Sequence, residues 1–148
     1  MEFKICKFNE LTVMEMYEIA RSRFEVFAME QKIIQEPELD GIDNDCYQVF
    51  YMDNGRVIAY CRIVPAGIAY NNISLGRVLV LNDYRRKGLA LIMIKEALKF
   101  IKEELQEDTV VLSGQVYAKG LYESVGFKII SDVYDEVGIP HVKMKIEL

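Results

Sequence analysis

Tryptophan is absent from this chain of 148 residues, and histidine, cysteine and proline are scarce, with one, three and three copies. The single histidine, His141, excludes any metal site that needs several histidine ligands. The cysteines at positions 6, 46 and 61 form no Cys-x-x-Cys pair, so the sequence indicates neither a zinc knuckle nor a redox disulfide. We therefore expect no metal, and we interpret the thiols as buried, reduced side chains of a cytoplasmic protein.

Long apolar runs and an excess of positive charge are also missing. No apolar run approaches the ~18 residues that a transmembrane helix needs, and the N-terminus lacks the layout of a signal peptide. The net charge of −5 argues against nucleic acid or an anionic membrane as a partner, because both need a basic face. The negative balance fits a cationic substrate such as an amine.

The length predicts one domain over residues 1–148, large enough to bury a core, and leaves a homodimer open. Apolar periodicity and turn residues predict helices over about 13–30, 86–106 and 115–124. Strands are predicted at 2–8, 46–53, 56–65, 73–81, 109–113, 127–134 and 141–147. Mostly antiparallel strands with helices packed on them give an α+β three-layer sandwich.

Local signals set several of these boundaries. Thr12-x-x-Glu15 is a capping box that starts the first helix. Asp53-Asn54-Gly55 is a hairpin turn between two strands, and Gly126 ends the third helix as a C-terminal cap.

A basic loop between a strand and a helix carries the most information about function. The buried strand 78–81 stops at a turn, and Arg85-Arg86-Lys87-Gly88-Leu89-Ala90 then opens an apolar-periodic helix. Backbone N–H groups at a helix start lack partners and carry partial positive charge, so the loop suits a phosphate chain. Gly88 and Ala90 are small enough for an anion to approach the backbone. The spacing is neither that of a P-loop nor that of a dinucleotide fold, and a solvated turn is the alternative.

The order Arg85-x-x-Gly88-x-Ala90 resembles the acyl-CoA-binding motif of the GNAT superfamily of N-acetyltransferases. Further along the chain, Tyr122-x-x-x-Gly126-Phe127 resembles the second motif of that family. The resemblance implies the GNAT fold and acetyl-CoA as co-substrate. It also implies that the backbone of residues 78–80 (Val78, Leu79 and Val80) holds the pantetheine arm. The amides of loop 85–90 would then hold the pyrophosphate, and the N–H of Leu79 or Val80, at a strand bulge, would stabilise the oxyanion.

Flanking segments resemble the ElaA-like branch of the superfamily. They are residues 23–31, Asp40-Gly41-x-Asp43, residues 62–65 and Gly138-Ile139-Pro140-His141. There are two departures. Tyr47-Gln48 stands where the branch usually has a histidine, and Ser113-Gly114-Gln115 replaces a more usual alanine-glutamine.

Acetyl transfer to an amine needs a group that takes the amine proton and one that stabilises the leaving thiolate. The resemblance makes Tyr122 the acid beside the sulfur, with a packing tyrosine as the alternative. Glu30 is the candidate base, because a carboxylate near a helix C-terminus opposes the dipole and should have a raised pKa. One alternative is a structural ion pair between Glu30 and Arg23, which lie seven residues apart on one predicted helix, that anchors the following acidic loop. Another is a water relay with no single base.

Arg23 and His141 are the candidate substrate-binding residues, although a histidine at a strand start is more often structural. Asp40, Asp43 and Asp45 form a solvated loop or an amine-attracting rim. The resulting hypothesis is an enzyme that moves an acetyl group from acetyl-CoA to a primary amine by direct transfer. The alternatives are an enzyme acting on protein or peptide amines and a non-catalytic acyl-CoA-binding module.

Overall fold

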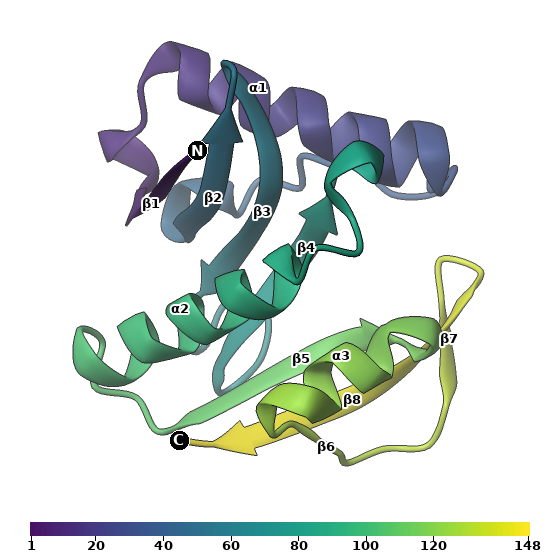
Figure 1. Ribbon diagram of the computed structural model, residues 1–148. Helices are drawn as coiled ribbons and strands as arrows, with labels where there is room; N and C mark the ends of the chain where they lie inside the picture. Colours follow the sequence, from purple (N-terminus) through teal and green to yellow (C-terminus); the bar gives the residue numbers. More distant parts are fainter.

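A computed structural model describes residues 1–148. One mixed sheet has the strand order β1-β2-β3-β4-β5-β8-β6, and β7 pairs with β8 (Figure 1). The strands are β1 (Glu2–Lys7), β2 (Tyr47–Asp53), β3 (Arg56–Val64), β4 (Ile73–Val80), β5 (Thr109–Gln115), β6 (Lys128–Ile129), β7 (Tyr134–Glu136) and β8 (Ile139–Glu147). All pairs are antiparallel except β4 with β5.

Helices cover both faces of the sheet, which confirms the α+β three-layer sandwich. Helix α1 (Val13–Arg23) lies on one face, and α2 (Leu89–Glu103) and α3 (Lys119–Val125) lie on the other (Figure 1). The larger apolar core lies between the sheet and α2 and α3, and includes Met93, Ile94 and Leu112. A smaller core beneath α1 includes Ile19 and Phe50. None of the helices has the length and apolar content to span a bilayer.

Helix α1 begins at the predicted capping box and ends in an unusual continuation. Glu15 N donates to Thr12 Oγ1 at 3.0 Å, and Thr12 N donates to Glu15 Oε1 at 2.8 Å. Residues Phe24–Glu30 then form a π-helix, whose wider turn is rare and often lies at functional sites.

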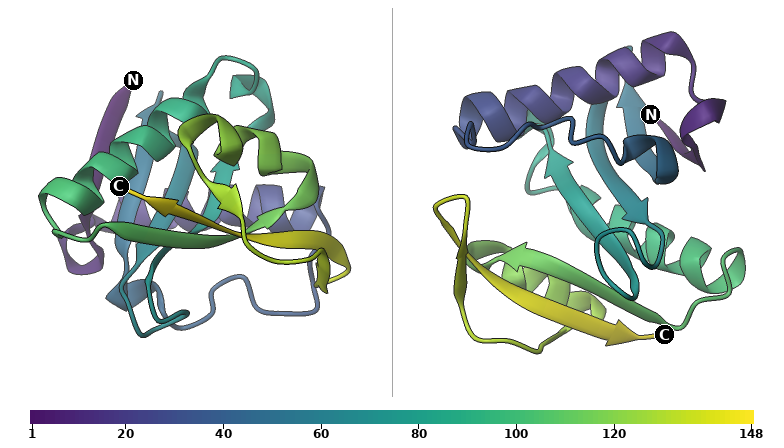
Figure 2. Two further views of the ribbon diagram at one scale, coloured as in Figure 1. Left: turned by 90° about the horizontal axis from the view of Figure 1, so that it is seen from below. Right: turned by 180° about the vertical axis from the view of Figure 1, so that it is seen from behind.

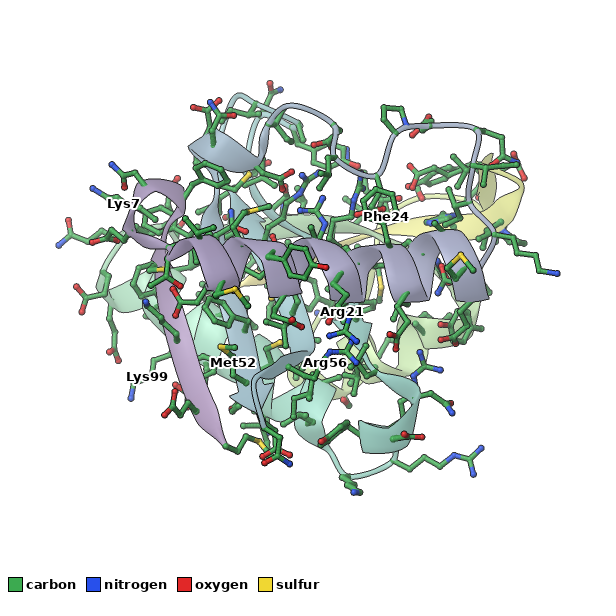
Figure 3. All side chains as sticks on the ribbon, turned by 90° about the horizontal axis from the view of Figure 1, so that it is seen from above. Lys7, Arg21, Phe24, Met52, Arg56 and Lys99 are labelled. Carbon is green, nitrogen blue, oxygen red and sulfur yellow. The ribbon has the colours of Figure 1, made fainter.

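Ion pairs on the outer side hold α1 to the start of β3. Glu18 accepts hydrogen bonds from both Arg21 and Arg56, two side chains that lie near each other beside α1 in Figure 3. Arg56 also pairs with Glu25 at 3.1 Å. These ion pairs hold Arg56, the first residue of β3, against the helix.

The sheet opens where β4 and β5 meet. These parallel strands pair at only two positions, Ile73–Val110 and Ser74–Val111, although β4 continues to Val80 and β5 to Gln115 (Figure 2). Beyond that point the strands diverge. A β-bulge further distorts β4, because two of its residues, Arg77 and Val78, lie opposite the single residue Cys61 of β3.

Several predicted boundaries need correction. The second helix begins at Leu89 rather than at 86, because Arg86 and Gly88 take positive φ angles of 64° and 75° that a helix cannot contain. The third helix begins at Lys119, and β5 extends to Gln115. The predicted strand 127–134 is divided into β6 and β7, and β8 begins at Ile139, so that His141 is its third residue.

Candidate active site

A cleft of about 290 Å³ opens where β4 and β5 part. Successive strand residues point to opposite faces, so side chains from both faces of the sheet line it. The lining includes Gly76, Arg77 and Val78 of β4, Leu112, Ser113 and Gln115 of β5, Tyr122 of α3, and Phe27 and Gln31 beside α1. Gln115 Nε2 donates to Gln31 Oε1 at 3.0 Å, which joins the two halves of the chain at the cleft.

The predicted phosphate loop borders a second hollow of about 220 Å³, at the start of α2. Its lining includes Val80, Arg86, Leu89 and Ala90. Gly88 is the N-cap residue, with a φ of 75° and no side-chain hydrogen bond to the helix start. A Cβ on Gly88 would meet no atom within 4 Å, so open space lies beside the loop backbone. The helix start therefore offers amides without a side-chain cap to an anion.

The side chain of Arg85 forms hydrogen bonds with other residues of the protein. Its Nε donates to the Val80 carbonyl at 2.8 Å, and its two terminal nitrogens donate to Glu30 at 2.6 and 2.8 Å. The guanidinium lowers the pKa of Glu30, so the predicted rise caused by the helix end is wrong. A bidentate cation outweighs the half-charge of a helix terminus.

Arg85 itself also lines the hollow, whereas two of the residues predicted at the cofactor line neither the hollow nor the cleft. Lys87 does not line the hollow, because its Nζ lies over the ring of Tyr84, 5.6 Å from the centroid. The side chain of Leu79 is buried in the core beneath α1. Leu79 could contribute only its backbone, which is the part the prediction concerned, and the bulge lies at Arg77 and Val78 rather than at the predicted Leu79 or Val80.

Tyr122 projects from α3 into the cleft. Its ring packs edge-on against Phe127 with centroids 6.0 Å apart, and burial raises the pKa of its hydroxyl well above the usual 10. The ring also packs on Gly114, where an added Cβ would lie 3.1 Å from Tyr122 Cε2. A neutral phenol is thus held at the cleft by the strand beside it.

Arg23 is completely buried, so it cannot reach a substrate. Its Nε donates to Glu38 at 2.8 Å and its Nη1 to Asp43 at 2.7 Å. The predicted substrate-binding role of Arg23 is wrong, and so is the alternative pairing with Glu30. The pairing of Arg23 with Glu30 assumed a regular α-helix with 3.6 residues per turn. Residues 24–30 instead form a π-helix, in which Gln31 N donates to Val26 O, and this interrupts the period.

Arg23 belongs to a buried network of three arginines and three carboxylates. Asp43 also accepts from Arg62 at 2.9 Å, and Glu38 also accepts from Arg77 of the bulge at 2.8 Å. Asp40 completes the network through Arg62, which lowers the pKa of Asp40 to about 2. Asp43 is buried, so the prediction of a solvated loop is wrong for Asp43, whereas Asp40 and Asp45 are exposed. The network connects α1, β3 and the bulge of β4.

Gln48 lies in the stretch Tyr47-Gln48, where the resemblance to the ElaA-like branch led us to expect a histidine. It is fully buried, donates to the carbonyls of Asp43 and Cys46, and accepts from the hydroxyl of Tyr60. The amide therefore supports the loop that carries Asp43.

His141 lies at the far end of the cleft and is buried. Its Nδ1 contacts the Ile139 carbonyl at 2.7 Å, and its Nε2 lies 3.3 Å from Glu136 Oε2. Its ring stacks on Tyr134. Glu136 also lines the cleft, and sequence reasoning missed it. The only sequence signal was its position two residues before Gly138-Ile139-Pro140-His141.

The three thiols are free and buried, as predicted. Burial raises the pKa of Cys46 to about 11 and that of Cys61 to about 12, which makes both poor nucleophiles. No cluster of three or more His, Cys, Asp or Glu side chains is arranged to hold a metal ion.

Known proteins match the chain both by sequence and by structure, and the matches of both kinds agree. The family model of the acetyltransferase (GNAT) domain matches residues 15–148. The UPF0039 protein C11D3.02c of Schizosaccharomyces pombe is 43% identical over 150 residues, covering 100% of this chain and 98% of that protein. The crystal structure of Escherichia coli ElaA matches with a TM-score of 0.88 and 27% identity, covering 99% of this chain and 100% of ElaA. An acyl-CoA N-acyltransferase from Pseudomonas aeruginosa matches with a TM-score of 0.90 and 28% identity, covering 99% of both chains.

Proposed function

Because the chain belongs to the GNAT acetyltransferase family, we propose that it transfers an acetyl group from acetyl-CoA to a primary amine, directly and within a ternary complex. One observation carries the proposal. The pairing of β4 with β5 stops at Ser74 and Val111, and the cleft that follows leads past Tyr122. The similar protein from Pseudomonas aeruginosa is described as an acyl-CoA N-acyltransferase, which supports the same donor here.

The hollow at the start of α2 suits the diphosphate of coenzyme A. The uncapped amides around Gly88 and the positive end of the helix dipole attract an anion. Arg86, which lines the hollow and is exposed, adds a cation. Arg85 acts indirectly, by tying the loop to the end of β4 and to Glu30.

The divergent part of β4 would hold the rest of the donor. Val78 lines the cleft at the bulge, where the ladder to β3 is interrupted. Backbone N–H groups at such a bulge can stabilise the oxyanion that forms on the thioester carbonyl.

Tyr122 would assist the departure of the thiolate. A thiol has a pKa near 8.5, and burial raises the pKa of Tyr122 above 10, so complete proton transfer is uphill. The hydroxyl therefore acts by donating a hydrogen bond to the developing thiolate. The three buried, free thiols fit a reducing compartment such as the cytoplasm.

The decisive experiment measures first the binding of coenzyme A and then the turnover of acetyl-CoA. Calorimetry with coenzyme A comes first, and release of free thiol from acetyl-CoA is then measured with a panel of small amines and peptides. We expect binding, followed by release with at least one amine. Binding without release across the panel would favour an acyl-CoA-binding module, release with peptides alone would favour a peptide N-acetyltransferase, and absence of binding would overturn the proposal.

A further inference from the structure

The charges that line the cleft are not balanced. Its charged lining residues are Glu36, Glu38, Glu136, Arg62 and Arg77. Both arginines are engaged in the buried network, and Glu38 is shared between Arg23 and Arg77. Glu36 and Glu136 remain, and neither pairs with a lysine or arginine. The cleft thus offers a substrate two carboxylates without a lysine or arginine partner, whereas each lining arginine is already paired with carboxylates, although Arg62 Nε itself has no hydrogen-bond partner.

Glu136 is placed in the cleft by a strained turn. It ends β7 and pairs with Ile139 of β8, so that Val137 and Gly138 alone form the turn, with φ angles of 50° and 80°. Positive φ at both central residues defines a type I′ turn, which asparagine and glycine favour. A β-branched residue such as Val137 rarely takes this conformation. The hairpin keeps Glu136 in place despite this local preference, and backbone strain of this kind concentrates at ligand sites.

The neighbours of Glu136 fix its carboxylate without enclosing it. Ser113 Oγ donates to Oε1 at 3.4 Å, and His141 Nε2 lies 3.3 Å from Oε2. An ionised carboxylate has about four acceptor positions, and the side chain is 44% exposed. Glu136 can therefore accept further hydrogen bonds from a ligand.

The two faces of the sheet separate this carboxylate from Tyr122. Leu112 and Gly114 of β5 point toward α2 and α3, where Gly114 meets the Tyr122 ring. Ser113 points to the opposite face, because strand residues alternate. Glu136, bound to Ser113, therefore lies on the side opposite the phosphate loop and Tyr122.

From these observations, we propose that Glu136 binds the ammonium group of the acceptor, which loses its proton to water in the cleft before the neutral amine attacks the thioester and the thiolate leaves, and that the acceptor is an amine without a carboxylate beside it. This inference rests on the proposed function and specifies its substrate class. A carboxylate on the acceptor would lie near Glu136, and no lysine or arginine that lines the cleft is free of a carboxylate partner. Lys143 has no carboxylate partner, but it does not itself line the cleft, and its Nζ is held over the ring of Tyr70, 4.1 Å from the centroid.

Matched pairs of substrates test the class. Each pair consists of an amine and the amino acid that differs from it by one carboxylate: cadaverine and lysine, agmatine and arginine, tyramine and tyrosine. We expect kcat/KM with acetyl-CoA to be at least tenfold higher for the amine in every pair that is turned over. In Glu136→Gln this preference should shrink toward unity through a rise in KM for the amine. Equal or reversed preference in the wild-type protein would overturn the inference.

A binding measurement separates this inference from the proposed function. Cadaverine and lysine are titrated calorimetrically into the protein saturated with coenzyme A. We expect cadaverine to bind at least tenfold more tightly than lysine, and Glu136→Gln to lose that binding while its thermal unfolding stays within a few degrees of wild type. Glu123→Gln, at an exposed carboxylate of α3 outside the cleft, is the matched control and should bind as wild type does.

The outcomes are distinguishable. If cadaverine binds as expected but no amine releases thiol, the proposed function fails and the acceptor site stands. If neither ligand binds, or if Glu136→Gln binds cadaverine as the wild-type protein does, the acceptor site is wrong even if turnover is observed.

Discussion

Arg85 donates one hydrogen bond to each carboxylate oxygen of Glu30, at 2.6 and 2.8 Å, and thereby ties the end of the π-helix to the phosphate loop. The same guanidinium donates to the carbonyl of Val80 at the end of β4. Three segments distant in sequence are thus held together beside the start of α2. We therefore propose that Glu30 is a positioning residue rather than the base.

Glu30→Gln should therefore retain turnover within about threefold, because the amide still accepts a hydrogen bond from Arg85. A lost general base would instead cost about 10²–10⁴-fold. The lowered pKa of Glu30 predicts how the stability of the fold should change with pH. The ion pair stabilises the fold above the unfolded pKa of about 4.3 and loses this effect as pH falls through the folded pKa. The difference in melting temperature between wild type and Glu30→Gln should accordingly vanish at low pH. A hundredfold fall in kcat at neutral pH would restore Glu30 as the base.

Tyr122→Phe should lower kcat at least tenfold and leave the Kd for coenzyme A nearly unchanged, because the hydroxyl acts on the leaving sulfur. The ring contacts with Phe127 remain in this variant, so the fold is preserved. Steady-state kinetics and calorimetry on the same preparation make the test. Unchanged kcat would remove Tyr122 from the mechanism.

Gly88→Val should weaken coenzyme A binding strongly. The backbone of Gly88 has a φ of 75°, which a β-branched residue resists, and the new side chain would occupy the open space in front of the loop amides. Gly67→Val is a matched control, because Gly67 also has a positive φ and open space but lies far from the hollow in sequence and outside its lining. Calorimetry should show the loss of affinity in Gly88→Val alone. Wild-type affinity in that variant would contradict our placement of the diphosphate.

Gly114→Val should displace the ring of Tyr122. The first carbon added at this position already lies 3.1 Å from both Tyr122 Cε2 and Leu112 Cδ1, so a valine overpacks the core by about 1–3 kcal/mol. Turnover should fall together with stability, whereas Gly114→Ala requires a shift of only a few tenths of an ångström and should be mild. Gly120→Val on α3, where no atom lies within 4 Å, serves as the control. Urea unfolding and kcat, measured on all three variants, test whether Gly114→Val loses more stability and activity than Gly114→Ala and the control Gly120→Val.

The buried network should respond both to mutation and to acid. Asp43→Asn leaves Arg23 and Arg62 incompletely paired and should cost about 3–5 kcal/mol of unfolding free energy. The pKa of Asp40 is lowered to about 2, so its contribution to stability is present above about pH 4 and is lost as pH falls from about 4 to 2. Urea unfolding at pH 7, 4 and 3 should show this decline in wild type and a smaller one in Asp40→Asn. An exposed control, Asp132→Asn, should follow the wild type.

Local sequence signals were sufficient wherever the feature is itself local. The Thr12 capping box, the Asn54-Gly55 hairpin turn and the Gly126 cap depend on neighbouring residues, and all three are present. The loop that opens α2 followed from the basic and small residues at the helix start, and the place of Tyr122 beside the cleft followed from the resemblance to the family's motifs.

Predictions failed where the structure depends on distant partners. Arg23 and Glu30 were paired on the assumption of a regular helix, and the π-helix between them turns each toward a different partner, Glu38 or Arg85. No sequence pattern predicts that Arg23, Arg62 and Arg77 contact the same three carboxylates, because the paired residues lie 15 to 39 positions apart in the chain. Glu136 was missed for a different reason: the adjacent turn that places it in the cleft has a positive φ at Val137, which a β-branched residue does not predict.

The central claim is that the divergence of β4 and β5 receives an acyl-CoA donor, with its diphosphate at the start of α2 and its sulfur at Tyr122. Diffraction from crystals grown with coenzyme A tests this most directly. We predict diphosphate oxygens about 2.7–3.2 Å from the backbone nitrogens around Gly88, and the sulfur within hydrogen-bond reach of the Tyr122 hydroxyl. Coenzyme A bound elsewhere, or with its sulfur remote from Tyr122, would contradict the account.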